Sequence, residues 1–513
     1  MVHPAFLQVR LWPLCIRLAR ILCVMEHTAA VSDEVYERAR LSRDARFDGR
    51  FFIGVKTTGI YCRPVCPANP PRSENVSFFA TAAAASEAGF RPCLRCRPEC
   101  APGTPAWAGT STTVNRGLRL IAEGALDDSD IESLAGRLGV TSRHLRRLFA
   151  KHLGASPQAV AHTQRLHFAK RLIDQTALSM REIAAAAGFG SVRRFNDTFR
   201  KTYGRAPREL RRGGNALVSS GALSVQLPYR KPFGWHELLN FLAGRATPGV
   251  ELVTSDRYLR TVRTGSGHGL IDVQDVGGAL SLTVHGIGTE SLFAAVQRTR
   301  GLFDLDAPID DIAMVLNRDR ILHAWLKRSP GIRVPGAWDG FELTVRAVLG
   351  QQVSVKAATT FAGRIADRYG ESVDVVVDDL PEAPGKLFPE PGVLARARLE
   401  RLGIIRSRAQ TIRSVARAVA SGELGFNTAQ PVDEFHAALT SIKGIGDWTA
   451  AYVAMRVLKD PDAFPTSDLG LLRAFESVDG KRLRPLELSA RAEAWRPWRA
   501  YAALLIWGSE PGG

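Results

Sequence analysis

The sequence predicts a multidomain, mainly α-helical protein of four folded units: a small α/β domain, an all-α domain with two similar helical pairs, a small antiparallel α+β domain and a larger all-α domain. Three observations support this prediction. A chain of 513 residues is too long for one hydrophobic core. All seven cysteines lie within the first hundred residues. A pattern of apolar, glycine and serine positions in the middle of the chain recurs at a separation of 49 to 50 residues.

The composition is that of a folded protein with a polyanionic partner. Hydrophobic residues make up 45% and charged residues 23% of the chain, which excludes wholesale disorder. Lysine and arginine exceed aspartate and glutamate by 17, an excess that suits nucleic acid better than a small neutral substrate. Cysteines gathered in one segment indicate a local metal or redox site rather than a disulfide framework, and they favour a cytoplasmic location.

Segments of biased composition separate the units. Residues 1–30 receive no role, because their apolar stretch is interrupted by arginines and makes a poor membrane span and a poor signal peptide; Met25 is a second candidate start. Two stretches rich in small, turn-forming residues, 101–113 and 213–224, are predicted linkers. The four units are predicted at 31–103, 113–213, 222–301 and 302–510.

The first unit carries two close cysteine pairs, Cys62-x3-Cys66 and Cys93-x2-Cys96. Two such pairs separated by a folded stretch are what tetrahedral thiolate coordination requires, because each pair approaches the metal from one side. We therefore expect one Zn²⁺ ion. The spacing alone leaves open whether the ion only holds a small domain together or also activates a sulfur atom. Cys100 lies outside the pattern and is expected to be a bystander.

The residues around these cysteines resemble the N-terminal zinc domain of the Ada family over residues 33–100, notably in TTGIYCRP and GFRPCLRC. The resemblance implies that the domain repairs methylphosphotriesters in DNA, with Cys62 as the methyl acceptor and a zinc ion that is both structural and catalytic. Loss of one thiolate charge on methylation reduces repulsion from DNA phosphates and would switch on DNA binding. The basic residues expected to hold the DNA backbone are Arg63, Arg91, Arg95 and Arg97.

The repeat in the middle of the chain predicts two helix-turn-helix units. Each copy has a short apolar helix, a glycine-containing turn (LGVTS; AGFGS) and a second helix with arginines between its apolar positions. The pair resembles the DNA-binding region of the AraC family, which implies recognition helices over residues 142–151 and 191–201 in a major groove. Two roles stay open for each arginine of these helices: contact with the edge of a base, or contact with a phosphate only. The candidate contacts are Arg143, His144, Arg146, Arg147, Arg193, Arg194 and Asn196.

The C-terminal half changes from strands to helices. Alternation over residues 280–284 and a glycine turn at 276–278 predict antiparallel strands, which give way to helices after residue 302. The stretch LTSIKGIGDWTA predicts a helix, a glycine hairpin and a new helix that starts near Asp447. Such glycines let backbone N–H groups approach a phosphate. The candidate DNA contacts in this hairpin are Lys443, Gly444 and Gly446.

Residues 224–508 resemble the AlkA family of helix-hairpin-helix DNA glycosylases, with matches in RAVLGQQVSV, KGIGDWTAAYVAMR and AWRPWRAYAALLIW. The resemblance implies that Asp468 is the catalytic carboxylate and that Trp448, Tyr452 and Trp507 line a pocket for a flipped base. Core packing is the alternative role for each aromatic residue. Trp448 stands where strand-cleaving relatives carry a nucleophilic lysine, so a monofunctional hydrolase is expected. The family's apolar wedge falls at the polar Gln352.

Together these features predict DNA alkylation repair combined with its regulation: hydrolytic excision of 3-methyladenine-type purines, and methyl transfer that activates sequence-specific DNA binding. The expected partners are alkylated duplex DNA, promoter DNA and RNA polymerase. A monomer without membrane attachment, in the cytoplasm and nucleoid of a bacterium, is expected. An alkylguanine transferase is not expected, because no cysteine follows Cys100. Two alternatives stay open: a transcription regulator with an inactive glycosylase-like domain, and a glycosylase whose zinc site is purely structural.

Overall fold

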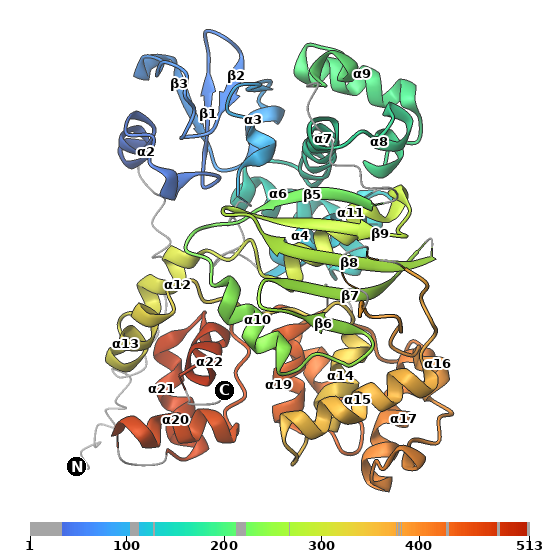
Figure 1. Ribbon diagram of the computed structural model, residues 1–513. Helices are drawn as coiled ribbons and strands as arrows, with labels where there is room; N and C mark the ends of the chain where they lie inside the picture. The colour runs from blue at the N-terminus through green and yellow to red at the C-terminus, as the bar shows by residue number, and fades with distance from the viewer. Residues whose placement is uncertain are drawn as a thin grey trace, which may run out of the picture.

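The computed structural model describes residues 33–102, 112–126, 129–211, 222–265, 267–375, 377, 380, 382–426, 430–479 and 483–509. The unassigned N-terminal segment with its candidate start at Met25, and most of both predicted linkers, lie outside the described residues. In Figure 1 a five-stranded sheet crosses the middle of the molecule. The cysteine-bearing domain and part of the helix-turn-helix domain lie on one side of this sheet, and helices of the C-terminal half lie on the other.

The first domain is a four-stranded sheet with two helices. Its strands lie in the order β3-β1-β2-β4, and β4 is parallel to β2 whereas the other neighbours are antiparallel. Tyr36 of the first helix stacks on Phe51 with ring centroids 4.2 Å apart, which seats that helix against the sheet. The elements are α2 (Asp33–Leu41), β1 (Phe52–Val55), β2 (Ile60–Cys62), β3 (Val76–Phe79), α3 (Ala82–Glu87) and β4 (Arg91–Pro92).

Two helix-turn-helix units follow, as predicted, and the repeat is visible in their helix caps. The side chains of Thr141 and Ser191 cap the N-termini of the two recognition helices. Both helices end at a glycine in the left-handed region, Gly154 and Gly204, where a side chain would be strained. The elements are α4 (Thr112–Ala122), α5 (Ile131–Arg137), α6 (Ser142–Leu153), α7 (Pro157–Gln175), α8 (Met180–Ala186) and α9 (Val192–Tyr203).

The third unit is an antiparallel sheet with the strand order β5-β9-β8-β7-β6. Leu280, Leu282 and Val284 of β9 are buried and alternate with half-buried residues, so one face of the strand packs against a core. The elements are β5 (Ala222–Pro228), α10 (Trp235–Ala243), β6 (Glu251–Val253), β7 (Arg257–Thr264), β8 (Gly267–Asp275), β9 (Ala279–His285) and α11 (Leu292–Leu302).

The fourth unit is all-α, and one hydrophobic core runs through its helices. Its fully buried Trp495 contacts the rings of Phe464 and Phe475. In the part of the chain that the structure describes, no helix is long and apolar enough to cross a membrane. The elements are α12 (Ile309–Leu316), α13 (Arg320–Arg328), α14 (Gly340–Leu349), α15 (Val355–Tyr369), α16 (Pro391–Leu394), α17 (Arg406–Ala420), α18 (Val432–Thr440), α19 (Asp447–Arg456), α20 (Leu469–Asp479), α21 (Pro485–Ala492) and α22 (Arg499–Trp507).

The four units pack against one another. The second helix-turn-helix unit and the central sheet share a hydrophobic core, to which Phe199 of α9 and Leu282 of β9 both belong. Elsewhere Arg119 of α4 donates a hydrogen bond to the carbonyl oxygen of Lys459, just beyond the C-terminal end of α19, at 2.8 Å. The helix-turn-helix domain and the C-terminal half of the chain are therefore in direct apolar and polar contact.

Candidate functional site

The four predicted zinc ligands come together at one edge of the first sheet. Cys62 ends β2 and Cys93 directly follows β4, and the parallel pairing of these strands places the two residues side by side. Cys66 and Cys96 lie in the turns that follow, and all four sulfur atoms lie within 4.8 Å of one another. The two sequence pairs thus become one set of four sulfur donors, the number that a tetrahedral zinc site requires.

This donor set fits a zinc ion. Four sulfur atoms so close together cannot all ionise unless a cation offsets their charge. Hydrogen bonds among the four sulfur atoms split their pKa values in the absence of a cation: they lower the pKa of Cys66 to about 7 and lower that of Cys93, whereas they raise those of Cys62 and Cys96. Cys93 and Cys96 are buried, whereas Cys62 and Cys66 are half-buried. The first pair is therefore the more accessible to a large substrate such as DNA.

A cavity of about 290 Å³ opens beside the cysteine cluster. Cys62, Cys66 and Cys93 line it together with Arg40 and Arg43. Arg40 is buried in an ion pair within α2, whereas Arg43 is exposed. Neither arginine was predicted as a site residue, because both precede the cysteine motif and only the packing of α2 against the sheet brings them to the cavity.

The arginines predicted around the cysteines differ in exposure. Arg91 and Arg95 are exposed. Arg63 and Arg97 turn inward, and each forms an ion pair with a buried aspartate. The aspartate that pairs with Arg97 belongs to α7 of the helix-turn-helix domain. Arg91 and Arg95 are therefore better placed than the other two for contact with a DNA phosphate.

The predicted base-reading residues lie on α6 and α9. The arginines among them are exposed, whereas His144 and Asn196 are half-buried. Buried Phe149 and Phe199 anchor the opposite faces of the same two helices. Each recognition helix thus presents a basic face to solvent, as contact with DNA requires. The exposed arginines are Arg143, Arg146, Arg147, Arg193 and Arg194.

Two indole groups hold Asp468, the predicted catalytic carboxylate, which directly precedes α20. Trp448 Nε1 donates to Asp468 Oδ2 at 2.7 Å, and Trp507 Nε1 donates to Oδ1 at 2.9 Å. The backbone N–H of Leu471 also donates to Oδ1, at 2.9 Å. Three segments that are far apart in the sequence therefore orient one half-buried carboxylate.

The three predicted pocket aromatics form one cluster. Trp448 and Tyr452 stack with centroids 5.3 Å apart and planes 5° apart, because a spacing of four residues places them on one face of α19. Tyr452 meets Trp507 nearly edge to face at a centroid distance of 6.3 Å. All three side chains are half-buried rather than part of the closed core. Such a surface suits an electron-poor ring.

Arg456 holds Tyr452 from one helical turn further along α19. Its Nη1 donates to the Tyr452 hydroxyl at 2.7 Å, and its Nη2 donates to the carbonyl oxygen of Gly336 at 2.9 Å. Burial by itself raises the pKa of Tyr452, but the positive charges of Arg456, Arg245 and Arg346 outweigh it and lower this pKa below its usual value. Arg456 was not predicted, although its i, i+4 spacing from Tyr452 was a usable signal.

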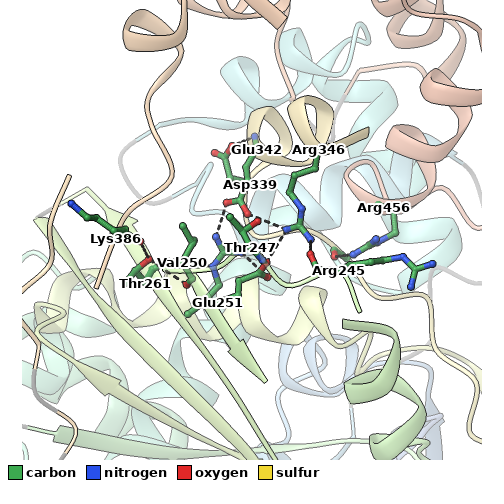
Figure 2. A network of polar contacts seen from close by, with 12 residues as sticks. Arg245, Thr247, Val250, Glu251, Thr261, Asp339, Glu342, Arg346, Lys386 and Arg456 are labelled. Carbon is green, nitrogen blue, oxygen red and sulfur yellow. Dashed lines mark hydrogen bonds and ion pairs between the residues drawn. The ribbon is translucent and has the colours of Figure 1, made fainter. Parts of the chain in front are cut away.

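A buried polar network fixes Arg346 and joins α14 to the central sheet (Figure 2). Arg346 of α14 donates to Glu251 at 2.9 Å and to Glu342 at 3.1 Å, and it also bonds the carbonyl oxygen of Arg245. Arg260 of β7 donates to Glu342 at 2.7 Å. Removal of one partner from such a buried pair leaves an uncompensated charge, so the sheet unit and α14 are tightly coupled.

The glycine hairpin lies at the N-terminal end of α19, as predicted. Gly444 has φ +96°, and a Cβ at this position would lie 2.2 Å from Thr411 Oγ1, so only glycine fits. Thr411 in turn donates to the carbonyl oxygen of Lys443 at 3.0 Å. Lys443, Gly444 and Gly446 are exposed. Exposed backbone at a helix N-terminus suits contact with a phosphate.

The predicted wedge, Gln352, lies in the turn between α14 and α15. It has φ +56° and is exposed together with Val353. The preceding residue, Gln351, donates a hydrogen bond to the carbonyl oxygen of Gly444 in the hairpin at 3.0 Å. The turn therefore lies next to the hairpin and has the exposure that insertion between base pairs requires.

Family models match all four units. The models described as “Metal binding domain of Ada” and “Helix-turn-helix domain” match residues 36–99 and 134–213. Those described as “AlkA N-terminal domain” and “HhH-GPD superfamily base excision DNA repair protein” match residues 224–339 and 345–500.

A relative in Mycobacterium tuberculosis, the “Probable bifunctional transcriptional activator/DNA repair enzyme AlkA”, is 41% identical over 475 residues, which cover 92% of this chain and 95% of the relative. The chain belongs to this bifunctional AlkA family. Two Escherichia coli proteins are each similar to one part of this AlkA-family chain. DNA-3-methyladenine glycosylase 2 is 34% identical over 55% of this chain and 96% of its own length. The “Bifunctional transcriptional activator/DNA repair enzyme Ada” is 34% identical over 39% of this chain and 55% of its own length.

These matches confirm the predicted fusion of an Ada-like part with an AlkA-like part. The protein is a DNA glycosylase of the helix-hairpin-helix superfamily with a zinc site and a DNA-binding regulatory domain, and DNA is its partner. The roles of individual residues stay predictions.

Proposed function

We propose that this protein excises alkylated purines of the 3-methyladenine type from duplex DNA, with Asp468 as the catalytic carboxylate. One observation carries the proposal. Both carboxylate oxygens of Asp468 accept indole N–H groups from Trp448 and Trp507, and the same indoles form the aromatic cluster. A base stacked on this cluster would therefore bring its sugar close to an oriented negative charge.

The chemistry of an alkylated purine matches these groups. Such a base carries positive charge, so it leaves without a strong general acid, and the aromatic rings hold it by stacking. As the C1′–N bond breaks, the Asp468 carboxylate stabilises the positive charge that develops on the sugar. Water then forms the new C1′–O bond, and its proton passes to Asp468. Trp448 offers no amine for a Schiff base, so the DNA strand stays intact.

Release of bases from alkylated duplex DNA tests this proposal. Wild type is expected to release 3-methyl and 7-methyl purines, and Asp468→Asn is expected to be slower by about a thousandfold or more. Asp462→Asn is a matched control, because Asp462 lies in the same loop but pairs with Arg499. Equal rates for wild type and Asp468→Asn, or strand cleavage by wild type, would contradict the proposal.

A second activity is favoured by the cysteine cluster. We propose that Cys62 accepts a methyl group from a methylphosphotriester in DNA, because it is half-buried at a cavity in whose wall Arg43 also lies. A bound zinc ion would keep the sulfur as a thiolate at neutral pH. The sulfur–carbon bond forms as the carbon–oxygen bond breaks, and the phosphotriester becomes a phosphodiester anion. A thioether is not cleared by hydrolysis, so each molecule reacts once.

Mass spectrometry after exposure to methylated DNA tests the acceptor. Wild type and Cys100→Ser are expected to gain one methyl group on Cys62, whereas Cys62→Ser is expected to gain none. Retained zinc without any methyl group on Cys62 in the wild type would leave a purely structural zinc site and overturn the proposal.

We further propose that methylation of Cys62 strengthens promoter binding by α6 and α9, because it removes one negative charge near the DNA backbone. The protein would act as a monomer and recruit RNA polymerase. Footprinting with wild type and Arg194→Ala, before and after methylation, tests whether methylation strengthens promoter binding. Sedimentation tests whether the protein is a monomer, and a pull-down with RNA polymerase tests recruitment. A promoter affinity that methylation leaves unchanged would contradict the regulatory role.

A further inference from the structure

Two neighbouring glutamines in the turn between α14 and α15 have different surroundings. Gln352 is exposed, whereas Gln351 is half-buried. Gln351 Nε2 donates to the carbonyl oxygen of Gly444 at 3.0 Å and to Thr449 Oγ1 at 3.1 Å. One side chain thus links the turn to both the glycine hairpin and the first turn of α19.

Helix α17 holds the same two segments from one side. Its Arg408 bonds the carbonyl oxygen of Gln351, and its Thr411, one helical turn later, donates to the carbonyl oxygen of Lys443. The turn, the hairpin and α17 are therefore joined pairwise by hydrogen bonds. Such a closed triangle cannot shear without the loss of at least one of these bonds.

The backbone of the turn needs this support. Gln352 has φ +56°, a conformation that costs free energy for any residue with a side chain. On its far side Ser354 caps α15 by accepting the N–H of Ala357 at 3.2 Å. With Gln351 held on one side and Ser354 on the other, Gln352 and Val353 are left exposed at the tip.

We propose that Gln351 is a positioning residue for base extrusion: it fixes the distance between the hairpin, which contacts the DNA backbone, and the tip of Gln352 and Val353, which fills the gap left by the flipped base. This inference rests on the proposed excision of a flipped base. Contact of the hairpin with the backbone would then place the tip at one defined step of the base stack. A tip that moves independently would lose this placement.

Gln351→Ala and Gln351→Glu, which both remove the amide donor, test the proposal in the full-length protein. Gln430→Ala is a matched control, because Gln430 Nε2 also donates to a backbone carbonyl oxygen, that of Gly425, at 2.7 Å. Base release is measured from duplexes in which the alkylated base is either paired or mispaired, since a mispaired base needs less extrusion. Melting temperature and affinity for undamaged duplex are measured for each variant.

Both Gln351 variants are expected to release the paired base about tenfold more slowly, as the loss of one or two hydrogen bonds implies, and to recover most of the rate on the mispaired base. Affinity for undamaged duplex and melting temperature are expected to stay close to those of Gln430→Ala. An equal loss on both substrates would indicate only a structural role and overturn the proposal, as would no loss on either.

A second readout separates this inference from the proposed substrate. A fluorescent 2-aminopurine placed next to an abasic-site analogue reports unstacking without any base release. If wild type releases no alkylated base, the proposed substrate is wrong, but the fluorescence increase on binding still compares wild type with Gln351→Ala. Equal increases for these two proteins would contradict the positioning role.

Discussion

The indole N–H of Trp507 donates to Oδ1 of Asp468 at 2.9 Å across 39 positions of the chain. Because Trp448 Nε1 donates a hydrogen bond to the other carboxylate oxygen, Oδ2, at 2.7 Å, the plane of the carboxylate is fixed before any DNA binds. A carboxylate that is oriented in advance stabilises developing charge without reorganisation. The last residue of α22 thus has a direct part in the proposed catalytic geometry.

Trp507→Phe should therefore slow base release although it keeps an aromatic ring. The variant loses the hydrogen bond to Asp468, and we expect a 10- to 100-fold lower single-turnover rate, which corresponds to about 1.4–2.8 kcal/mol of transition-state stabilisation. Trp325→Phe serves as the control, since Trp325 packs against Phe475 in the same unit. A Trp507→Phe rate equal to that of the control would show that the hydrogen bond is unimportant.

The two glycines of the hairpin should respond differently to alanine. Gly444→Ala places a Cβ 2.2 Å from Thr411 Oγ1 at φ +96°, whereas a Cβ on Gly446 meets no atom within 4 Å. We expect Gly444→Ala to weaken duplex binding by about tenfold through distortion of the hairpin, which costs about 1–3 kcal/mol, and Gly446→Ala to weaken it much less. Fluorescence anisotropy with a labelled duplex measures both, and similar affinities would count against a hairpin held by Thr411.

Asp304 predicts a pH dependence of stability. Burial raises the pKa of its carboxyl group to about 6 from the usual 3.8. Between about pH 4 and pH 6 the folded state therefore holds a proton that the unfolded state has lost, so stability is greatest below this window and falls as the pH rises through it, by at most about 3 kcal/mol. Tyr501 and the N–H of Val334 both donate to one oxygen of Asp304, at 2.8 and 3.2 Å, so an asparagine retains both bonds.

Asp304→Asn should remove this dependence. Melting temperatures of wild type and variant are compared from acid to neutral pH, and the advantage of the variant is expected to grow as the pH rises. Asp310→Asn, at an exposed position of α12, is the control. Melting curves of wild type and Asp304→Asn that shift in parallel with pH would refute the assignment.

Removal of zinc should affect the first domain most. Cys93 and Cys96 are buried, so loss of the ion leaves their sulfur atoms buried without a metal partner. It also removes the metal that would join the end of β2 to the end of β4. Cys93→Ser is expected to purify with less than about a tenth of the wild-type zinc content, because a three-ligand site binds the ion far more weakly, whereas Cys100→Ser is expected to retain it. Elemental analysis of the purified proteins decides between these outcomes, and full zinc in Cys93→Ser would exclude the four-cysteine site.

Much of the fold was open to prediction because its signals are local. The repeat of glycine, serine and apolar positions predicts two helix-turn-helix units, since caps and turns depend on neighbours within a few residues. The alternation over residues 280–284 predicts a strand for the same reason. The domain limits at 31–103, 113–213, 222–301 and 302–510 stay predictions.

The candidate sites were only partly open to prediction. The spacing of Cys62, Cys66, Cys93 and Cys96 predicts a metal site, and the resemblance to the AlkA family implies the role of Asp468; both assignments stay predictions. Arg43, Arg456 and Gln351 were not predicted, because their roles depend on contacts with segments far away in the chain. Arg63 and Arg97 stand in the zinc motif, yet only the folded structure shows that they turn inward to buried aspartates.

By itself the sequence determined the chemical groups: four thiols in two close pairs, two basic recognition helices, a glycine hairpin and an acidic residue after it. Only the tertiary structure decided which groups meet, namely which indoles hold Asp468, which glutamine joins the wedge turn to the hairpin, and that the helix-turn-helix domain packs against the central sheet. The physical reason is range. Helix caps, turns and pairs of metal ligands depend on interactions between residues that are close in the sequence. The orientation of the Asp468 carboxylate and the position of the wedge turn depend on side chains that only the packed core brings within hydrogen-bonding distance.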